Sequence, residues 1–455
     1  MRHETFIKTT WLDVPAADVF RWHSRPGAFE RLVPPWERVE VLDRVGGIEN
    51  GGRVTLRGPG GRWVVEHRDV VPDLQFRDVL LSGPFPRWEH THRMKPAGEG
   101  ACLLEDRIEY SLPFGSWGSA LAGRWVRASL ERLFDYRHRR TAEDLRRHQG
   151  KSARRILVTG ASGLVGSDLL PLLSTGGHEV IRLGRGPGGW DPEAGRLDPG
   201  ALEGLDGVVH LAGENIAGGR WTPDRKARIR QSRVLGTRLL CETLARLQRP
   251  PETLVSASAV GFYGDRGHED ISESSGAGRG YLAEVCEDWE KATEPARRAG
   301  IRVVNLRIGI VLSPKGGALS KMLPPFSLGL GGRLGHGGQY MSWISLPDLS
   351  AVILRALTDP RLHGPVNAVA PAAVTNQEFT RTLASVLGRP ALVPLPAFLA
   401  RLAFGELADA LLLGGAKVRP AKLIQSWFEF QHPTLEVALR DLLGRPEKPG
   451  KEVNP

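Results

Sequence analysis

The sequence is poor in cysteine and has no long apolar run. Its three cysteines, Cys102, Cys241 and Cys286, lack the spacing of metal ligands, which excludes a disulfide scaffold and a cysteine-rich metal centre. The longest apolar stretch, ALVPLPAFLA, contains two prolines and is too short to cross a bilayer. The opening MRHETFIKTT carries charge and no apolar segment, so we expect no signal peptide and a cytoplasmic protein.

Recognition modules for nucleic acid are missing as well. The formal net charge of +10 is spread along the 455 residues, and its one local concentration runs from Arg137 to Arg155. No aromatic residues interleave with these arginines, so we interpret them as a solvated helix face and expect no nucleic-acid partner. The length suffices for two or three domains, each with its own core.

Residues 1–150 are expected to form the first domain. A strand-like run, a short helical pattern (PAADVFRWHS), a meander of strands such as RWVVEHRDVV and CLLEDRIEYSL, and a long helix over about Gly118 to His148 follow one another. This order predicts an antiparallel sheet curled around the last helix. No base, nucleophile or metal cluster stands out in it.

This order of elements resembles the α+β helix-grip, START-like fold of the polyketide cyclase (SRPBCC) superfamily, over about residues 3–148. The resemblance implies an apolar ligand held between sheet and helix. Five aromatic residues are candidates to line its site, although any single one of them more often simply fills the core: Trp63, Phe76, Trp88, Phe114 and Trp125.

A glycine-rich turn, TGASGLVG, follows a short apolar strand and precedes an apolar helix and a second strand. Gly160 permits the tight turn, Gly163 lets the backbone approach a pyrophosphate, and Gly166 allows close packing of helix and strand. The start of the helix offers free N–H groups to phosphates. Arg185 ends the second strand, where an acidic residue would favour NAD, so we expect NADP(H) as cofactor.

Strands and helices then alternate, which predicts a Rossmann-type, doubly wound parallel sheet with the cofactor at its carboxyl edge. The motifs LVTGASGLVG, HLAGENIAGGRWT, SASAVGFYG, YLAEVCEDWE and LGLGGRLGHGGQYMSWI resemble the extended short-chain dehydrogenase/reductase superfamily. Within it, they resemble the NADP-binding "epimerase family protein" group of nucleoside-diphosphate-sugar epimerase relatives. The resemblance places the reductase domain at residues 154–400 and a small C-terminal domain at 401–450.

The same resemblance implies a set of cofactor contacts. Arg185 would bind the 2′-phosphate, and Arg233 and Arg238 occupy family positions near the cofactor, although a solvated helix face would explain these two equally well. The whole predicted set is Gly160, Ser162, Gly163, Leu164, Val165, Gly166, Arg185, Leu211, Ala212, Gly213, Arg233 and Arg238.

Extended short-chain reductases in general pair a serine or threonine with a Tyr-x-x-x-Lys motif, in which the lysine lowers the pKa of the tyrosine, whereas the epimerase family group commonly lacks this lysine. Ser258 and Tyr281 fit the catalytic positions, but Val285 stands where the lysine would be. Without that cation the pKa of Tyr281 is expected near its free value of about 10. Three alternatives remain: Arg233 supplies the charge; another group, such as Glu214, Tyr263 or Glu284, does the acid–base work; or the site binds cofactor without turnover.

A Gly- and Pro-rich segment over residues 316–350 has the character of a substrate loop. Tyr340 and Trp343 in it, with Tyr263, are the predicted substrate contacts. Relatives generally have WIHIDD where this chain has WISLPD, so Ser345 replaces a histidine and the substrate here could differ. No metal is expected.

The function predicted from the residues and the resemblance is an NADP-dependent oxidoreductase or epimerase with a fused module for an apolar ligand. Its partner would be a small-molecule substrate such as a nucleotide sugar. The alternative is a non-catalytic NADP(H)-responsive binding or regulatory protein, which the missing lysine favours. A third hypothesis joins the two: the START-like domain delivers an apolar substrate to the reductase site.

Overall fold

The computed structural model describes residues 3–113, 115–184, 186 and 189–446, and for residues 115–119 and 121 it describes the backbone alone. Phe114 and Arg185 therefore lie outside the described residues. The chain forms two compact units, Met1–Ala153 with Pro171–Gly177, and Arg154–Leu170 with His178–Pro455. Within the described residues, no helix has the length and apolar character needed to cross a membrane.

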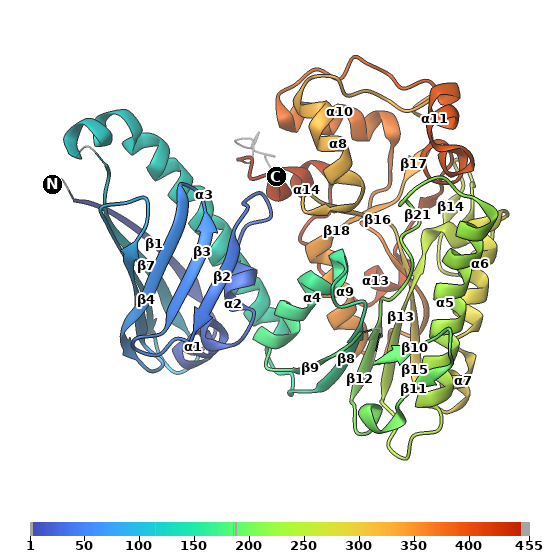
Figure 1. Ribbon diagram of the computed structural model, residues 1–455, viewed down its shortest axis with the longest axis horizontal. Helices are drawn as coiled ribbons and strands as arrows, with labels where there is room; N and C mark the ends of the chain where they lie inside the picture. The colour runs from blue at the N-terminus through green and yellow to red at the C-terminus, as the bar shows by residue number, and fades with distance from the viewer. Residues whose placement is uncertain (1–2, 114, 185, 187–188, 447–455) are drawn as a thin grey trace. The chain divides into compact units, whose positions relative to one another are not determined.

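The first unit contains a seven-stranded antiparallel sheet in the order β1-β7-β6-β5-β4-β3-β2 (Figure 1), which confirms the predicted helix-grip fold. Alternate residues of β7 are buried, as expected for a strand with one face on the core. The elements are β1 (Glu4–Leu12), α1 (Ala16–Ser24), α2 (Ala28–Leu32), β2 (Glu40–Val45), β3 (Arg53–Gly58), β4 (Gly61–Val71), β5 (Gln75–Ser82), β6 (Arg87–Pro96), β7 (Cys102–Ser111) and α3 (Gly115–His148).

The residues expected to line the ligand site lie in different environments. Phe76 is a core residue with 4% of its surface exposed, and Trp63 and Trp88 are half-buried with ring centroids 5.4 Å apart. Trp125 is 72% exposed, so its assignment to the lining was wrong: the neighbouring stripe of α3, with Val126, faces the sheet instead. The arginine-rich end of α3 is not wholly solvated either, because Arg140 is only 3% exposed.

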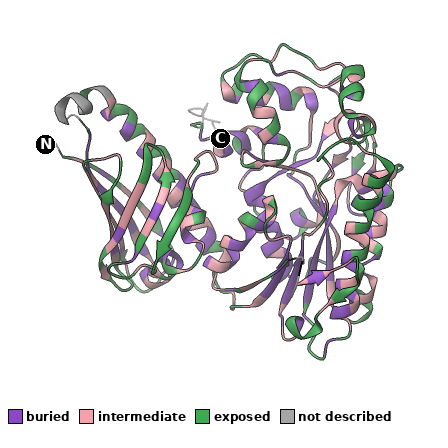
Figure 2. Ribbon diagram, viewed as in Figure 1, coloured by how far each residue is buried: buried purple, intermediate pink, exposed green. Residues whose placement is uncertain are grey.

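The second unit is built on a six-stranded sheet in the order β19-β15-β13-β12-β8-β9, with every neighbouring pair parallel. The predicted Rossmann-type sheet is therefore confirmed, and its strands are mostly buried (Figure 2). The strands are β8 (Arg155–Thr159), β9 (Glu179–Leu183), β12 (Gly207–His210), β13 (Thr253–Ala259), β15 (Arg302–Ile308) and β19 (Gly364–Ala368).

Helices cover both faces of this sheet. On one face Val208 packs with residues of α5 and α7, such as Leu240 and Ala296. On the other, a Cβ at Gly207 would lie 2.9 Å from the Leu357 side chain of α9. The helices are α4 (Leu164–Thr175), α5 (Pro223–Leu244), α6 (Tyr281–Lys291), α7 (Glu294–Arg298) and α9 (Leu346–Thr358).

The remaining, mostly shorter elements lie in the connections between the strands of this sheet and in the C-terminal part of the chain. They are β10 (Trp190–Asp191), β11 (Arg196–Leu197), β14 (Asp270–Ile271), β16 (Ile310–Ser313), α8 (Gly317–Ser327), β17 (Tyr340–Met341), β18 (Trp343–Ser345), β20 (Val374–Thr375), α10 (Asn376–Leu387), α11 (Ala397–Phe404), α12 (Glu406–Ala408), β21 (Lys417–Val418), α13 (Ala421–Gln425) and α14 (Leu435–Leu442).

Candidate functional site

The glycine turn joins the end of β8 to the start of α4. Gly160 has a φ of +68°, and a Cβ there would lie 2.7 Å from the carbonyl carbon of Leu211, so only glycine fits without a backbone shift. A Cβ at Gly166 would lie 2.4 Å from the carbonyl oxygen of Gly160. Gly166 thus packs α4 against the turn itself rather than against a strand. Gly163, in contrast, is exposed just before α4 begins.

This arrangement fits the pyrophosphate of a dinucleotide. The strand order reverses between β8 and β12, and ligands of such sheets bind outside the carboxyl ends of the strands at that point. The first turn of α4 offers unpaired N–H groups and the positive end of the helix dipole. Ser162 is exposed on the turn, whereas Leu164 and Val165 are half-buried at the start of the helix.

A buried hydrogen-bond chain supports the turn from below. The Thr159 hydroxyl lies 2.8 Å from Nδ1 of His210, and Nε2 of His210 lies 3.0 Å from the Thr237 hydroxyl. Trp289 donates its indole N–H to the same Thr237 oxygen at 2.9 Å. Burial lowers the pKa of His210 to about 4, so the ring is neutral at pH 7. The sequence did not indicate this series of hydrogen bonds, because the four residues come from four separate elements, β8, β12, α5 and α6.

The residues that directly follow β12, Leu211, Ala212 and Gly213, form a wall beside the glycine turn. Thr159 accepts hydrogen bonds from the N–H groups of Leu211 (3.2 Å) and Ala212 (3.3 Å), which holds both residues against β8. Gly213 is exposed, and a Cβ there would lie 3.4 Å from the guanidinium carbon of Arg233. The structure therefore brings Leu211, Ala212, Gly213 and Arg233 together, as the predicted cofactor set requires.

The arginines of the predicted set are placed differently. Arg233 lies over the Trp289 ring at 5.0 Å and donates to the carbonyl of Ile229 at 3.1 Å, and burial lowers its pKa. Arg238 is exposed and lines a surface hollow with Lys291 on the outer side of α5 and α6. Five residues rotate about 140° around a helix, so the two arginines leave α5 on different sides.

Ser258 at the end of β13 is buried and donates a 2.7 Å hydrogen bond to the Glu290 carboxylate of α6. Arg307 of β15 holds the same carboxylate through two hydrogen bonds of 2.8 Å. Burial alone would lower the pKa of Arg307, but the Glu290 carboxylate raises it above its ordinary value. The serine predicted as catalytic is therefore part of a buried ion-pair network that the sequence did not indicate.

The same network accounts for Tyr263. Arg307 donates to the Tyr263 hydroxyl at 2.9 Å, and this hydroxyl donates to the side chain of Asn367 at 2.7 Å. Tyr263 has no exposed surface, and burial raises its pKa. As the chain stands, the geometry makes Tyr263 a buried support of the sheet edge.

Tyr281 is the first residue of α6 and is half-buried. Its hydroxyl donates a 2.6 Å hydrogen bond to the main-chain carbonyl of Lys226. The expectation of an unperturbed hydroxyl was wrong: burial raises the pKa of Tyr281, and the positive charges of Arg233 and Arg230 only partly oppose this shift. The phenolate is therefore scarcer at neutral pH than in a free tyrosine.

A lysine does lie beside Tyr281, although not at the family position. Lys226 of α5 places Nζ 4.6 Å from the centre of the Tyr281 ring, above its face, while Val285 is buried with 2% of its surface exposed. Lys226 also pairs with Glu406 of α12 at 2.8 Å. This ion pair links α12 to the start of α5, whose Lys226 carbonyl accepts the hydrogen bond from Tyr281. The sequence alone did not indicate this link.

The predicted substrate loop contributes one partly exposed candidate. Tyr340 is half-buried, with Lys417 5.9 Å from its ring centre. Trp343 is 1% exposed and donates to a main-chain carbonyl, so it is a core residue as the chain stands. Ser345 is fully buried: it caps α9 and lies 2.8 Å from Nδ1 of His432. The serine in WISLPD therefore belongs to the fold, with His432 beside it.

Three family models match separate parts of the chain. Residues 156–369 match the NAD dependent epimerase/dehydratase family. Residues 12–135 match a family described as polyketide cyclase / dehydrase and lipid transport, and residues 395–442 match a domain of unknown function, DUF1731.

Known proteins give a consistent result. An epimerase family protein of Mycobacterium bovis, Mb2239, is 45% identical over 64% of this chain and 98% of its own length. The crystal structure of a protein described as the nucleoside-diphosphate sugar epimerase from Corynebacterium glutamicum has a TM-score of 0.78 and 33% identity, over 96% of this chain and 90% of that one. The structure of human epimerase family protein SDR39U1 with NADPH has a TM-score of 0.59 and 34% identity, over 64% and 99%.

The Mycobacterium bovis and Corynebacterium glutamicum relatives are covered over 98% and 90% of their own lengths at 45% and 33% identity, and the glycine turn lies in the matched region. The chain therefore belongs to the epimerase family of extended short-chain dehydrogenases/reductases, with a polyketide cyclase-type domain before the epimerase region and a DUF1731 domain after it.

Proposed function

We propose that this chain is an NADP(H)-dependent oxidoreductase or epimerase. The observation that carries the proposal is the glycine turn, where Gly160 and Gly166 admit no Cβ and the backbone at Gly163 lies open at the start of α4. The human relative described with NADPH supports the choice of cofactor. Bound in this cradle, NADP(H) would supply or accept a hydride at its nicotinamide ring.

The chain's own residues would hold and orient the cofactor. The turn, with Ser162, Leu164 and Val165, would bind the pyrophosphate, and Arg185 the 2′-phosphate. The wall formed by Leu211, Ala212 and Gly213 would lie beside the adenine and its ribose. The guanidinium of Arg233, adjacent to Gly213, adds a positive charge to the same wall.

Ser258 and Tyr281 are the proposed catalytic pair, which would bind a substrate carbonyl or hydroxyl group. For that role the Tyr281 hydroxyl must exchange its bond to the Lys226 carbonyl for one to substrate. We propose a small-molecule substrate of the nucleotide-sugar class, since the Corynebacterium relative is described as a nucleoside-diphosphate sugar epimerase. Tyr340 is the proposed aromatic contact.

The second candidate function, a non-catalytic NADP(H)-responsive protein, is favoured by the surroundings of Tyr281. Its hydroxyl is already bonded to a carbonyl, burial raises its pKa, and Val285 replaces the activating lysine. A cofactor could bind at the glycine turn without a change in any of these features.

For the first unit we propose an apolar ligand, bound at one end of the helix-grip sheet. Trp63, Phe85 and Trp88 form a ring cluster with centroids 5.0–5.5 Å apart, and all three are only half-buried. Such a partly open aromatic cluster suits a flat or aliphatic molecule.

Two measurements on the full chain test the proposal. Calorimetry should show NADPH binding at least about tenfold more tightly than NADH, with the preference lost in Arg185→Ala; about 1.4 kcal/mol separates the two cases. Equal or reversed preference would refute the NADP assignment. A screen of sugar nucleotides, ketones and aldehydes with C4-deuterated NADPH, read by mass spectrometry, should find deuterium in a substrate. Tight binding with no transfer would favour the non-catalytic alternative.

A further inference from the structure

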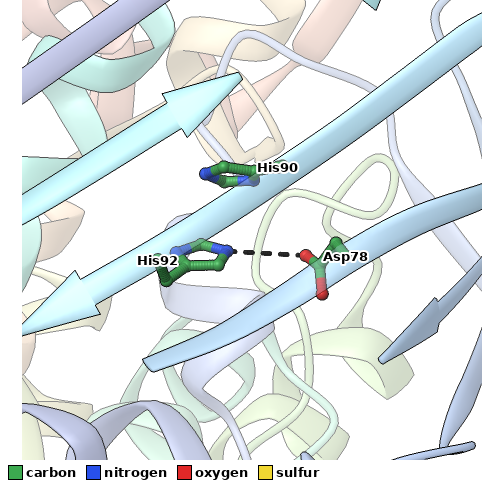
Figure 3. Close-up of side chains that lie close together, drawn as sticks. All are labelled: Asp78, His90 and His92. Atoms are coloured by element: carbon green, nitrogen blue, oxygen red, sulfur yellow. Dashed lines mark ion pairs between the residues drawn. The ribbon is translucent and has the colours of Figure 1, made fainter. Parts of the chain in front are cut away.

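Five histidines and two aspartates gather between the helix-grip sheet and the helices that pack on it. The sheet contributes His67, Asp78, His90, His92 and Asp106, and the helices contribute His23 of α1 and His138 of α3. His90 and His92 are two apart on β6, so they share one face of the sheet. The strand register pairs His90 with Asp78 of β5, and His92 with Asp106 of β7. Figure 3 shows His90 and His92 one above the other, with the Asp78 carboxylate beside His92.

Asp106 orients the histidines around it. One of its oxygens lies 2.8 Å from Nε2 of His90, and the other lies 2.7 Å from Nε2 of His138 on α3. Nδ1 of His92 is 2.6 Å from the first oxygen but off the line of a hydrogen bond, so this buried nitrogen is poorly satisfied. The side chains of His90, His92, Asp106 and His138 are all 6% exposed or less.

Asp78, His90 and His92 lie close enough together that they could hold one metal ion. One ligand atom from each lies within 4.8 Å of the other two. Nε2 of His92 is 3.5 Å from a carboxylate oxygen of Asp78, too long for a charged hydrogen bond. Two ligands of a tetrahedral ion with bonds of about 2.0 Å lie about 3.3 Å apart, which agrees with this gap.

We propose that Asp78, His90 and His92 form a binding site for a divalent transition-metal ion, such as Zn²⁺, with Asp106 as the carboxylate that orients the two imidazoles. Imidazole with carboxylate is a donor set that these ions accept, and a carboxylate behind a ligating histidine is their usual outer partner. A 2+ ion would also add positive charge between the buried Asp106 carboxylate and the partly exposed Asp78 carboxylate.

Two further features bear on the affinity. Asp78 is 23% exposed and its neighbour His67, whose Nδ1 is 2.7 Å from the Asp78 carboxylate, is 13% exposed, so an ion can enter from solvent at this side. Arg137 of α3 lies near enough for the charges of Asp106 and Asp78 to act on it. Its competing positive charge favours an exchangeable ion over a permanently held one.

The test uses the full chain with no polyhistidine tag, stripped with a chelator and titrated with Co²⁺ as a spectroscopic probe. We expect one Co²⁺ per chain, with d–d absorption typical of nitrogen and oxygen ligands. Asp78→Asn and His92→Gln should abolish it, and Asp106→Asn should weaken binding about 10–100-fold. His268→Gln changes an exposed histidine of the other unit and should leave the titration unchanged.

Asp78→Asn protects the test against loss of fold, because it keeps the side-chain volume and changes the most exposed of the three ligands. Its circular dichroism without metal should match that of the parent chain. The proposal fails if the parent chain shows no d–d band, or if Asp78→Asn and His92→Gln bind Co²⁺ as tightly as the parent. In either case the cluster would be a hydrogen-bonded ion network without metal.

Discussion

The Thr159 hydroxyl and the His210 ring are joined across the point where the sheet reverses its strand order, 2.8 Å apart, at the ends of β8 and β12. Thr159 also accepts the N–H groups of Leu211 and Ala212, so one hydroxyl links the glycine turn to the wall beside it. A neutral His210 is needed for this arrangement, because an imidazolium would offer no acceptor to the threonine.

Acid should therefore destabilise the second unit through His210. Its pKa is about 4 in the folded chain and 6.5 when exposed, so the unfolded state binds more protons as the pH falls between these values. The loss should reach about 3 kcal/mol at pH 4. Urea unfolding at several pH values should show that the free energy of unfolding falls with acid by this amount less in His210→Asn than in the parent chain. An identical decline in both proteins would contradict the prediction.

Replacement of Gly160 should damage the turn and its ligand together. Gly160→Ala places a Cβ against the Leu211 backbone at a φ of +68°, so we expect a lower Tm, a stability loss of at least about 1 kcal/mol and NADPH binding weakened at least tenfold. Gly276→Ala is the matched control, since a Cβ there meets no heavy atom within 4 Å apart from its chain neighbours, and Gly276 is not among the glycines with positive φ. Calorimetry and thermal melts on both variants decide the matter; equal behaviour would count against the cradle.

Glu290 should matter to stability far more than its neighbour Glu287. Glu290→Ala leaves the buried Arg307 guanidinium unpaired and removes the acceptor of Ser258, which should cost about 3 kcal/mol. Glu287 pairs with Lys291 on the exposed side of the same helix, so Glu287→Ala should change stability by less than about 1 kcal/mol. Denaturant midpoints that shift equally in the two variants would disprove the distinction.

The pH profile of hydride transfer should reveal whether Tyr281 acts as a base. Because burial raises its pKa above the ordinary value of 10.0, the phenolate fraction at neutral pH is small and grows about tenfold per pH unit. A rate that depends on this phenolate should rise in the same proportion from pH 7 to pH 9, and Tyr281→Phe should abolish the rise while NADPH binding persists. A flat profile in the parent chain would assign the base to another group.

The two folds and the cofactor turn were predictable because they depend on neighbouring residues. Gly160, Gly163 and Gly166 lie in one short segment between the end of β8 and the start of α4, and this local context identifies the turn. The strands and helices were predictable for a similar reason, because apolar residues recur along each segment with the period of a strand or of a helix. The orientation of a long helix was less secure: Trp125 and Val126 are adjacent on α3, and only packing decided that the valine faces inward.

The candidate sites were only partly predictable for the opposite reason. Ser258 was identified as a catalytic candidate, but its bond to Glu290 connects residues 32 positions apart, and the bond from Tyr281 to Lys226 spans 55. Sequence motifs carry no information about such pairs, which depend on how α6 packs against β13 and α5. The same holds for Ser345 and His432, brought together from positions 87 apart.

The amino-acid sequence by itself determined the order of the domains, the phosphate-binding turn and the absence of the lysine at Val285, since each is a property of contiguous residues. Only the tertiary structure decided that Tyr263 and Trp343 are buried, that the Tyr281 hydroxyl is bonded to a carbonyl, and that Asp78, His90, His92 and Asp106 meet on one face. The tyrosine contacts depend on how elements distant in sequence pack together. For the four residues of the cluster the physical reason is strand register, because a shift of one residue would turn these side chains to the opposite face of the sheet.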